Sequence, residues 1–340
     1  NHLFGFFSIF NEKAIQDITL YKGDFPAKYG GRLSSVVDIQ TKEGNAKKIA
    51  GSVSVGLLAA SADLEGPLIN DKTTFFLSGR QSYLGFIADP LIKYFSGYDA
   101  ANYGFNDINA KITHRFDNKN KLIFSFYHSY DFGQTSSSEA ALYFNQHESV
   151  SWGNFLSSLT WNRVINSKLF LNTLAHYSRY NYASSNSYGQ TDNNYYTSTE
   201  SDYQSTIHDI GINSNLTWFR SSAITLKAGL GYTLQKFLPG VESSYSTNIN
   251  SNGFPYQLTN TTGNLSNQSH EIDLYNDNDL QLKDNLMLHA GFRYVLYKNS
   301  RIYSHIEPRL NLEYSLGKTR FNLSYTLAHQ YNHLLSTSEI

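Results

Sequence analysis

The stretch Asn285–Tyr297 reads NLMLHAGFRYVLY and alternates between two kinds of side chain. One set of alternate positions, from Leu286 to Leu296, is apolar throughout. The other set mixes polar with apolar side chains, among them His289 and Arg293. Because successive side chains of a β-strand point to opposite faces, this period of two predicts a strand with one apolar face.

The same period recurs along most of the chain. Clear cases are Lys121–Tyr130, Ile224–Lys236 and Arg320–Leu327. The pattern predicts about twelve strands in all. They lie near residues 51–66, 73–87, 103–116, 120–131, 150–164, 167–182, 202–219, 223–238, 267–283, 285–298, 303–316 and 319–332.

The connections between these segments alternate between short and long. The short ones are Pro67–Lys72, Asp117–Lys119, Ile165–Asn166, Arg220–Ser222, Asp284 and Gly317–Lys318. The long ones are expected near 88–102, 132–149, 183–201 and 239–266, and only 299–302 breaks the alternation. An up-and-down meander with tight turns at one end and long loops at the other is typical of an outer-membrane β-barrel.

Composition agrees with this interpretation and excludes other classes. Of the 340 residues, 15% are aromatic and only 16% are charged, whereas ordinary soluble domains carry roughly 25% charged residues. No stretch approaches the ~20 apolar residues of a membrane helix. The net charge of −1 gives no basic footprint for nucleic acid. The absence of cysteine excludes disulfides, thiol catalysis and cysteine-ligated metal.

A soluble β-sandwich is the alternative fold, since its strands also alternate. Three features favour the barrel: strands longer than the usual five or six residues, long loops on one side only, and polar faces suited to a water-filled lumen. The predicted fold class is therefore all-β, an antiparallel up-and-down transmembrane β-barrel. Aromatic residues near the predicted strand ends suit interfacial girdles, although aromatics favour strands generally. They are Tyr127, Tyr130, Trp152, Trp161, Tyr177, Tyr180, Tyr182, Trp218, Tyr294 and Tyr297.

Residues 1–45 do not follow the meander. Asn11 is a candidate cap for a short helical turn, and strands are expected at Ile18–Tyr21 and Val36–Gln40. Glycines in this stretch permit positive φ or a close approach of the backbone to a neighbour. They are Gly23, Gly30 and Gly31.

The stretch AIQDITLYKGDFPAKYGGRLSSVVDIQTKEG (residues 14–44) resembles the end of the plug domain of TonB-dependent outer-membrane receptors. That family closes its plug with a strand of the type IERIEVLKG, then P…YG, then a strand ending in ITK. The form GGRLSSV is similar to receptors of Bacteroidetes-type bacteria, whereas the plug end of SusC-type importers reads differently. HIEPRLNLEYSL (His305–Leu316) with LSYTLAHQY (Leu323–Tyr331) also resembles a mid-barrel hairpin. The matching plug residues are Ile18, Leu20, Lys22, Gly23, Pro26, Tyr29, Gly30, Val36, Ile39, Thr41 and Lys42.

The resemblance implies two parts and a location. Residues 1–45 would be the C-terminal end of a plug inside the barrel, and residues 46–340 the first strands, about twelve, of a probable 22-stranded barrel. The TonB box and most of the plug do not occur in this sequence, so we expect a fragment of a longer receptor in the bacterial outer membrane.

The resemblance also implies a function and partners. The receptor would bind a substrate at its extracellular loops and import it by TonB-energised movement of the plug. Its partners would be a TonB-type inner-membrane energy-coupling protein, reached through the missing N-terminal box, outer-membrane lipid or lipopolysaccharide, and possibly a surface lipoprotein. The alternative is a structural or assembly-complex barrel subunit without active transport. A third class, a soluble adhesive β-protein, stays in solution without detergent.

Contacts between plug and barrel are expected to involve charge. Lys22, Lys28 and Arg32 would face acidic groups of the wall, because buried charges require pairing; the alternative is that they are solvated turn charges. Tyr29 and Asp38 complete the predicted contact set. The acidic candidates on the wall are Glu271, Asp273, Asp277 and Asp279.

No motif indicates an enzyme, a cofactor or a metal site. Histidines are scattered singly, and no nucleophile elbow occurs. The sequence YNDND offers oxygen ligands for Ca²⁺, but on a strand only Asp277 and Asp279 share a face. Binding is therefore the expected role, of a small molecule such as a siderophore, a glycan or a peptide. Tyrosine among Ser and Asn suits ligand capture, against the alternative of merely mobile loops. The candidate ligand-binding residues are Tyr188, Tyr195, Tyr196, Tyr245, Phe254 and Tyr256.

Overall fold

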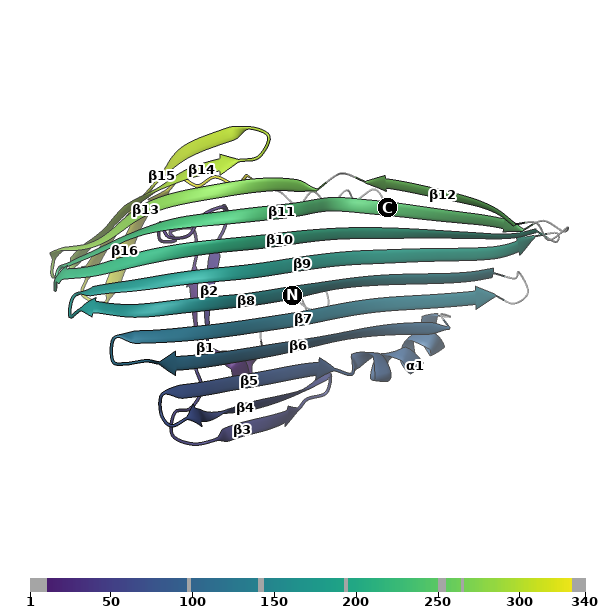
Figure 1. Cartoon of the computed structure of the whole chain (residues 1–340), viewed down its shortest axis with the longest axis horizontal. Coiled ribbons are helices and arrows are strands. Elements are labelled where there is room, and N and C mark those ends of the chain that lie inside the picture. The colour runs from purple at the N-terminus through teal and green to yellow at the C-terminus, as the bar shows by residue number, and fades with distance from the viewer. Residues whose placement is uncertain are drawn as a thin grey trace.

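The computed structural model describes residues 11–96, 99–139, 144–192, 195–249, 255–263 and 266–331. Most of these residues form one 14-stranded antiparallel sheet in which neighbours in sequence are neighbours in space, from β3 at one margin to β16 at the other. The predicted all-β meander is thus confirmed as an open, curved part of a barrel (Figure 1). No helix among the described residues is long and apolar enough to span a membrane.

The strands differ greatly in length. The shortest lie toward the two margins, and the longest lie in the middle of the sheet (Figure 1). Their bounds are β3 (Ala50–Val55), β4 (Ala59–Ile69), β5 (Thr73–Ser82), β6 (Ala100–Arg115), β7 (Asn120–Glu139), β8 (Phe144–Asn166), β9 (Leu169–Asp192), β10 (Tyr195–Ser221), β11 (Ile224–Ile249), β12 (Pro255–Gly263), β13 (Asn267–Lys283), β14 (Leu286–Lys298), β15 (Ile302–Leu316) and β16 (Thr319–Thr326).

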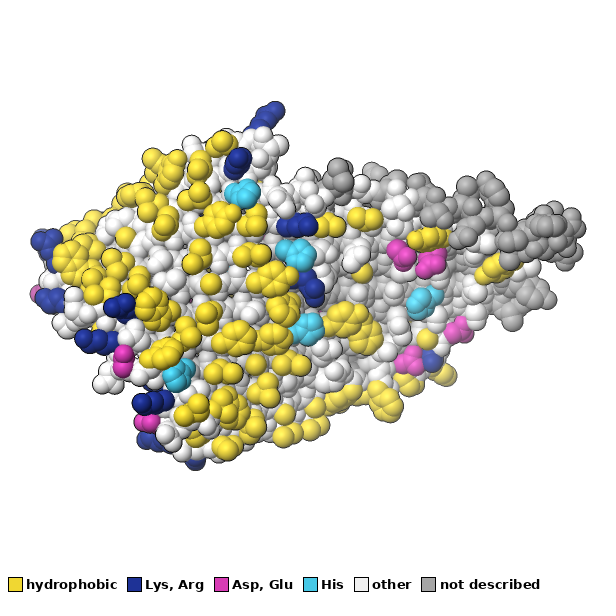
Figure 2. Space-filling model, viewed as in Figure 1, with side chains coloured by type: hydrophobic (Ala, Val, Ile, Leu, Met, Phe, Trp, Pro, Cys, Tyr) yellow, Lys and Arg dark blue, Asp and Glu magenta, His cyan; other side chains and the backbone are white. Residues whose placement is uncertain are grey.

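An apolar band covers one part of the outer face. Among the described side chains of β10, the exposed large apolar ones all fall between Ile210 and Phe219. That stretch matches the ~9–11 residues with which a tilted strand crosses a bilayer. β10 has 27 residues in total, so more than half of it extends beyond the band. Figure 2 shows hydrophobic side chains gathered over the half of the sheet that ends in tight turns, with Lys and Arg at that rim.

The prediction of long loops was wrong for most of these regions, which are strands instead. Strands β7, β8, β9 and β10 continue through 132–149 and 183–201, and β11 with β12 fills much of 239–266. Helix α1 (Leu84–Ser96) replaces the end of the predicted strand 73–87, which stops at Ser82, and continues into the remaining predicted loop. Its Asp89 accepts a hydrogen bond from the Ala101 N–H of β6 at 2.9 Å. Outside the band both faces of a strand meet water, so apolar alternation disappears there although the backbone ladder continues.

Two strand predictions were also wrong. The segment 51–66 is a hairpin of β3 and β4 rather than one strand, closed by the Gly56 N–H donating to the Ala59 carbonyl at 2.9 Å. The last strand ends at Thr326 instead of continuing to 332. Beyond it, the His329 N–H donates to the buried Glu307 carboxylate at 2.8 Å. That hydrogen bond holds the chain against β15 and takes it out of the ladder.

Candidate functional site

Residues 11–49, here called the strap, lie on the hollow side of the sheet (Figure 1). The strap begins with a 3-10 helix, η2 (Glu12–Ala14), whose cap Asn11 accepts a hydrogen bond from the Lys13 N–H at 3.1 Å. Strands β1 (Ile15–Tyr21) and β2 (Val36–Thr41) pair antiparallel in a sheet of their own. The predicted helical turn and two strands are confirmed.

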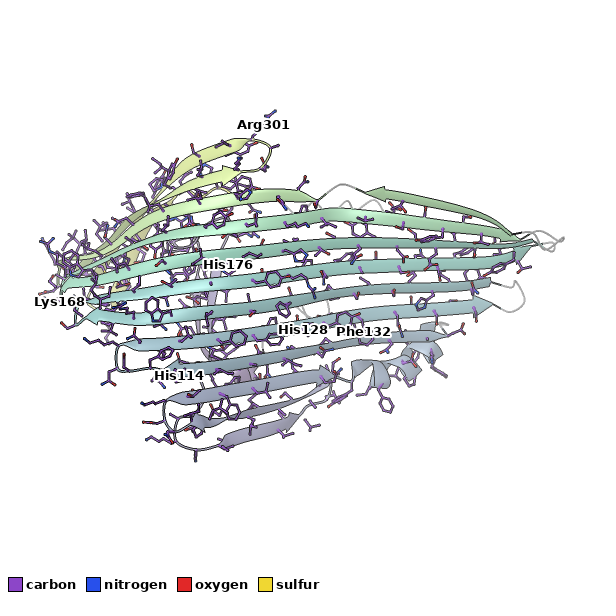
Figure 3. All side chains as sticks on the ribbon, viewed as in Figure 1. His114, His128, Phe132, Lys168, His176 and Arg301 are labelled. Atoms are coloured by element: carbon purple, nitrogen blue, oxygen red, sulfur yellow. The ribbon has the colours of Figure 1, made fainter. Side chains whose placement is uncertain are left out.

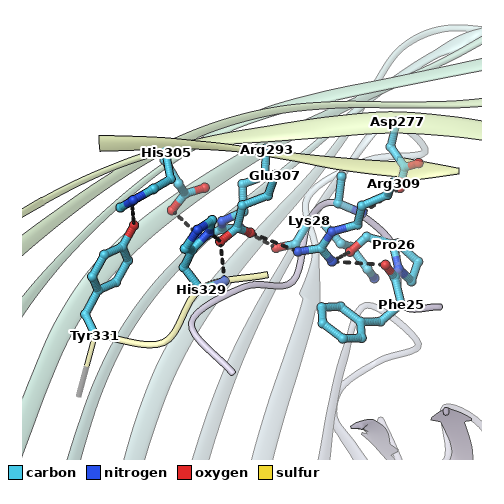
Figure 4. Close-up of polar contacts among 12 residues, drawn as sticks. Phe25, Pro26, Lys28, Asp277, Arg293, His305, Glu307, Arg309, His329 and Tyr331 are labelled. Atoms are coloured by element: carbon cyan, nitrogen blue, oxygen red, sulfur yellow. Dashed lines mark hydrogen bonds and ion pairs between the residues drawn. The ribbon is translucent and has the colours of Figure 1, made fainter. Parts of the chain in front are cut away.

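Arg309 of β15 attaches the strap to one margin of the barrel wall. Its Nη1 donates to the carbonyl oxygens of Phe25 and Pro26, at 3.0 and 3.1 Å (Figure 4). Its guanidinium carbon lies 4.3 Å from the centroid of the Phe25 ring. Glu307, which is fully buried, neutralises this charge through Nη2 at 3.0 Å. The buried arginine is therefore paired, as a charge out of water requires.

Arg293 of β14 makes a second attachment beside the first. Its Nη1 donates to the Lys28 carbonyl at 3.0 Å, and Nη2 contacts Glu271 and Asp273 at 3.3 and 3.0 Å. A Cβ on Gly30 would lie 2.5 Å from the Arg293 Nε. Glycine is therefore needed here for the close approach of the arginine, as the sequence predicted for this stretch.

Two further contacts complete this attachment. The Ala27 N–H donates to Asp277 Oδ2 of β13 at 3.0 Å. The Asn311 amide of β15 donates to Asp24 Oδ2 at 2.6 Å. Three adjacent wall strands therefore hold the loop between β1 and β2 mainly by its backbone.

Glu43 is the centre of a separate attachment, on β5, β6 and β7 near the opposite margin. Its carboxylate lies 2.8 Å from Lys121 Nζ and 3.6 Å from Arg115 Nη2, and its carbonyl accepts from Thr74 Oγ1 at 2.7 Å. Lys111 Nζ also donates to the Thr41 carbonyl at 2.7 Å. The strap therefore bridges the hollow of the sheet.

The prediction that the cations of the strap pair with acidic groups of the wall was wrong. Lys28 Nζ lies 3.7 Å from Asp38 and 4.4 Å over the Tyr29 ring, so it pairs within the strap. Arg32 donates to the Gly31 carbonyl at 2.8 Å. Lys22 makes no hydrogen bond or ion pair with the described residues. The strap therefore contacts the wall through backbone groups and carboxylates, such as that of Glu43, rather than through these cations.

The wall carboxylates are already occupied, which explains that difference. Glu271 and Asp273 pair with Arg293, as given above, and Asp279 lies 2.6 Å from Lys227 and 2.7 Å from His289. A strap cation would compete with these fixed partners. Asp277 is the fourth of the predicted acidic residues, and it accepts a hydrogen bond from the Ala27 N–H of the strap rather than from a strap cation.

Tyr29 joins the middle of the β1–β2 loop to Asp38 in β2. The Tyr29 hydroxyl donates to Asp38 Oδ2 at 2.5 Å. Burial raises the pKa of Tyr29, and the hydrogen bond to Asp38 raises it further. Burial lowers the pKa of Lys28, while the charge of Asp38 opposes that change. These groups therefore stabilise the internal shape of the strap.

The candidate ligand tyrosines lie on different faces of the extended strands. Ile210 and Ile212 of β10 face outward, and Tyr196 has the same parity. Tyr245 pairs with Glu200 and so shares the outer face. Tyr188 pairs with Thr199, which has the opposite parity, so Tyr188 faces the hollow side. All three line one polar depression near the strand tips.

The other three candidates are less fully described. The backbones of Tyr195 and Tyr256 lie in β10 and β12, and Phe254 lies outside the described residues. On the hollow side, Tyr182 and Tyr203 form an edge-to-face pair with centroids 6.0 Å apart. The prediction treated Tyr182 as a girdle residue at a strand end, but it lies within β9. No group of three or more metal-ligating side chains occurs among the described residues.

No protein-family model matches the chain, and no curated protein is significantly similar to it in sequence. Solved structures match its fold. The pyoverdine outer membrane receptor FpvA from Pseudomonas aeruginosa PAO1 superposes with a TM-score of 0.65 at 12% identity, covering 95% of this chain and 52% of that one. The siderophore receptor PiuA from Acinetobacter baumannii gives 0.62 at 13% identity, covering 92% and 54%.

The RagAB peptide importer gives a TM-score of 0.50 at 8% identity, covering 75% of this chain and 33% of that one. Identities this low show the fold alone. The chain has the fold of a TonB-dependent outer-membrane receptor barrel, in part, and spans about half the length of FpvA and PiuA.

Proposed function

We propose that this chain is part of an outer-membrane receptor that binds a substrate outside the cell and imports it when the plug moves. Residues 1–45 are the end of the plug, and residues 46–340 belong to the barrel. A TonB-type inner-membrane protein supplies the energy through a segment of the plug that this sequence does not include. The receptor is not an enzyme.

One observation carries the proposal: the strap bridges the hollow side between two groups of wall strands. Its attachments are mainly hydrogen bonds and ion pairs, as the contacts of Arg309 and Glu43 show, and only a few of its apolar side chains, such as Phe25, are buried. Each such contact contributes a modest net free energy, about 1.5–3 kcal/mol where one partner is charged, and water can replace it. A segment held in this way can shift under force without exposing a hydrophobic core.

The extended strands support substrate capture. β9 and β10 carry Tyr, Ser, Asn and Thr far beyond the apolar band, and Tyr supplies contact area at low entropic cost. The substrate class is a small molecule, a glycan or a peptide. FpvA is described as bound to pyoverdine and RagAB as a peptide importer, so this fold accommodates cargo of different kinds. A surface lipoprotein is a further candidate partner.

The test measures whether the strap moves when the inner membrane is energised. Ser35→Cys is made in the full-length receptor, and it is the single thiol within these 340 residues, which contain no cysteine. We expect a membrane-impermeant thiol reagent to label it faster in energised cells than in cells treated with an uncoupler. Equal rates would favour the structural or assembly role and contradict import.

A disulfide lock provides the matched control. Asp24→Cys with Asn311→Cys joins the strap to β15, where the two side chains touch. Ser52→Cys with Asp63→Cys joins two paired wall strands instead. The first lock should abolish the energised increase in Ser35→Cys labelling until reductant is added, and the second should leave it intact.

A further inference from the structure

A line of basic side chains crosses the outer face on directly paired positions of neighbouring strands. His128 of β7 pairs with Phe155, Phe155 pairs with Arg179 of β9, Arg179 with His208, and His208 with Lys236 of β11. Cross-strand partners share a face, so all five point outward. His128, Arg179, His208 and Lys236 are called the basic row below.

On β10 the basic row marks the upper boundary of the apolar band, whereas on β7 two aromatic side chains, Tyr130 and Phe132, lie beyond it. The exposed apolar side chains of β10 begin at Ile210 and continue toward the tight turn. His208 is the neighbouring outward residue on the other side of Ile210, away from that turn. Figure 2 shows Lys, Arg and His side chains in a line at the edge of the hydrophobic region, and Figure 3 labels His128 there. A bilayer that covers the band therefore brings its headgroups to this level.

The cations of the basic row are available to an anion. Arg179 and Lys236 are exposed and make no ion pair with the described residues. Arg179 lies 6.0 Å over the Phe155 ring, and His208 Nδ1 is 2.9 Å from the Tyr177 hydroxyl. No Asp or Glu occupies an outward position within two residues of any member along its strand. The positive charge is therefore not neutralised by the protein on this face.

A hollow adjoins the row on the side away from the band. It has a volume of about 250 Å³ and is lined by His128, Tyr130, Gly153, Arg179, Asn181 and Gln204, among others. Gly153 stands at an outward position between β7 and β9, so its missing side chain leaves the floor open. The hollow thus brings together the Arg179 guanidinium, the His128 ring, the amides of Asn181 and Gln204 and a tyrosine hydroxyl.

We propose that the basic row binds the phosphate of a phosphorylated lipid headgroup in the outer leaflet. Arg and Lys bind phosphate through charge-assisted hydrogen bonds, and cations near a membrane surface are attracted to anionic lipid. The acyl chains of such a lipid would contact the apolar band directly below the basic row. A lipid therefore contacts both the band and the row, whereas free phosphate contacts the row alone. The inference rests on the membrane placement in the proposed function and not on transport.

The test uses the purified protein in neutral detergent with diphosphoryl lipid A as the probe, and native mass spectrometry to count bound lipid. Arg179→Gln with Lys236→Gln removes two charges of the row. Lys168→Gln with Arg220→Gln removes two exposed charges at the opposite rim, where Figure 3 labels Lys168. We expect the first pair to lower lipid A affinity at least about tenfold and the second to leave it unchanged. Arg179→Lys should retain most of the binding.

Three results would overturn the proposal. They are equal losses in both double variants, equal affinity of the native protein for lipid A stripped of phosphate, and displacement of lipid A by equimolar inorganic phosphate. Heat-modifiable electrophoretic migration confirms that each variant is folded. A failure of transport leaves these measurements unaffected, and a wrong membrane placement shows separately as a reversed topology in the labelling experiment below.

Discussion

Arg309 of β15 contacts Phe25 of the strap in two ways, by a hydrogen bond of 3.0 Å to its carbonyl and by a cation–π contact of 4.3 Å with its ring. The two residues lie far apart in sequence, one in the strap and one in β15. The ring covers a guanidinium that Glu307 already neutralises. This relationship makes Arg309 the residue through which the strap and the wall are most closely coupled.

Replacing Arg309 alone should be more damaging than replacing the whole ion pair. Arg309→Met leaves the carboxylate of Glu307 buried without its guanidinium, which costs about 3–5 kcal/mol in comparable buried pairs. Arg309→Met with Glu307→Gln removes that penalty. We expect the midpoint of heat modification to fall sharply in the single variant and to recover partly in the double one. A double variant no better than the single would show that Glu307 is satisfied by its other partner, the His329 N–H.

Gly30→Ala should loosen the strap through Arg293. The new methyl would lie 2.5 Å from Arg293 Nε, so the guanidinium must leave its position at the Lys28 carbonyl. We expect trypsin to cleave after Lys28 faster in this variant than in the native protein. Adding Arg293→Ser to Gly30→Ala removes the clash but does not restore the hydrogen bond to the Lys28 carbonyl, so cleavage should stay fast.

The control for that prediction is Gly31→Ala. No atom lies within 4 Å of a Cβ at Gly31, although its φ of +73° disfavours a side chain. Strain at Gly31 acts on the strap alone and not on Arg293. If Gly31→Ala accelerated cleavage as much as Gly30→Ala, backbone strain rather than displacement of Arg293 would explain both.

Leu230→Arg should impair insertion, because Leu230 faces outward and is 56% exposed within the apolar band. An arginine facing lipid near the middle of the bilayer costs about 2–4 kcal/mol. Thr233→Arg on the same strand points to the hollow side, where it lines a polar depression. The yield of folded receptor in the outer membrane should fall in the first variant and stay near native in the second. Similar yields would refute the assignment of the two faces.

The sequence predicts the part of each strand that lies in the band, because only there does one face meet lipid and the other water. It predicts the strands poorly above the band, where both faces are polar, as the outward Glu200 and the inward Ser201 of β10 show. The glycines of the strap were identified correctly, because Gly30 is a point of close approach whereas Gly23 and Gly31 have positive φ. The wall residues that contact the strap were not predicted. Several of them bind backbone carbonyls, such as that of Phe25, and side-chain identity does not reveal such acceptors. Arg309 was missed for this reason.

The topology prediction places the tight turns in the periplasm and the extended strands outside the cell. Asp117 shapes one turn by accepting from the Lys119 and Asn120 N–H groups at 2.6 and 2.7 Å, so Asn118 beside it can be replaced without losing that bond. Ser138 near the tip of β7 is exposed on the far side of the band. In intact cells an impermeant maleimide should label Ser138→Cys and not Asn118→Cys, whereas both should react after lysis. Labelling of Asn118→Cys alone in intact cells would reverse the orientation, and would place the basic row at the inner leaflet instead of the outer one.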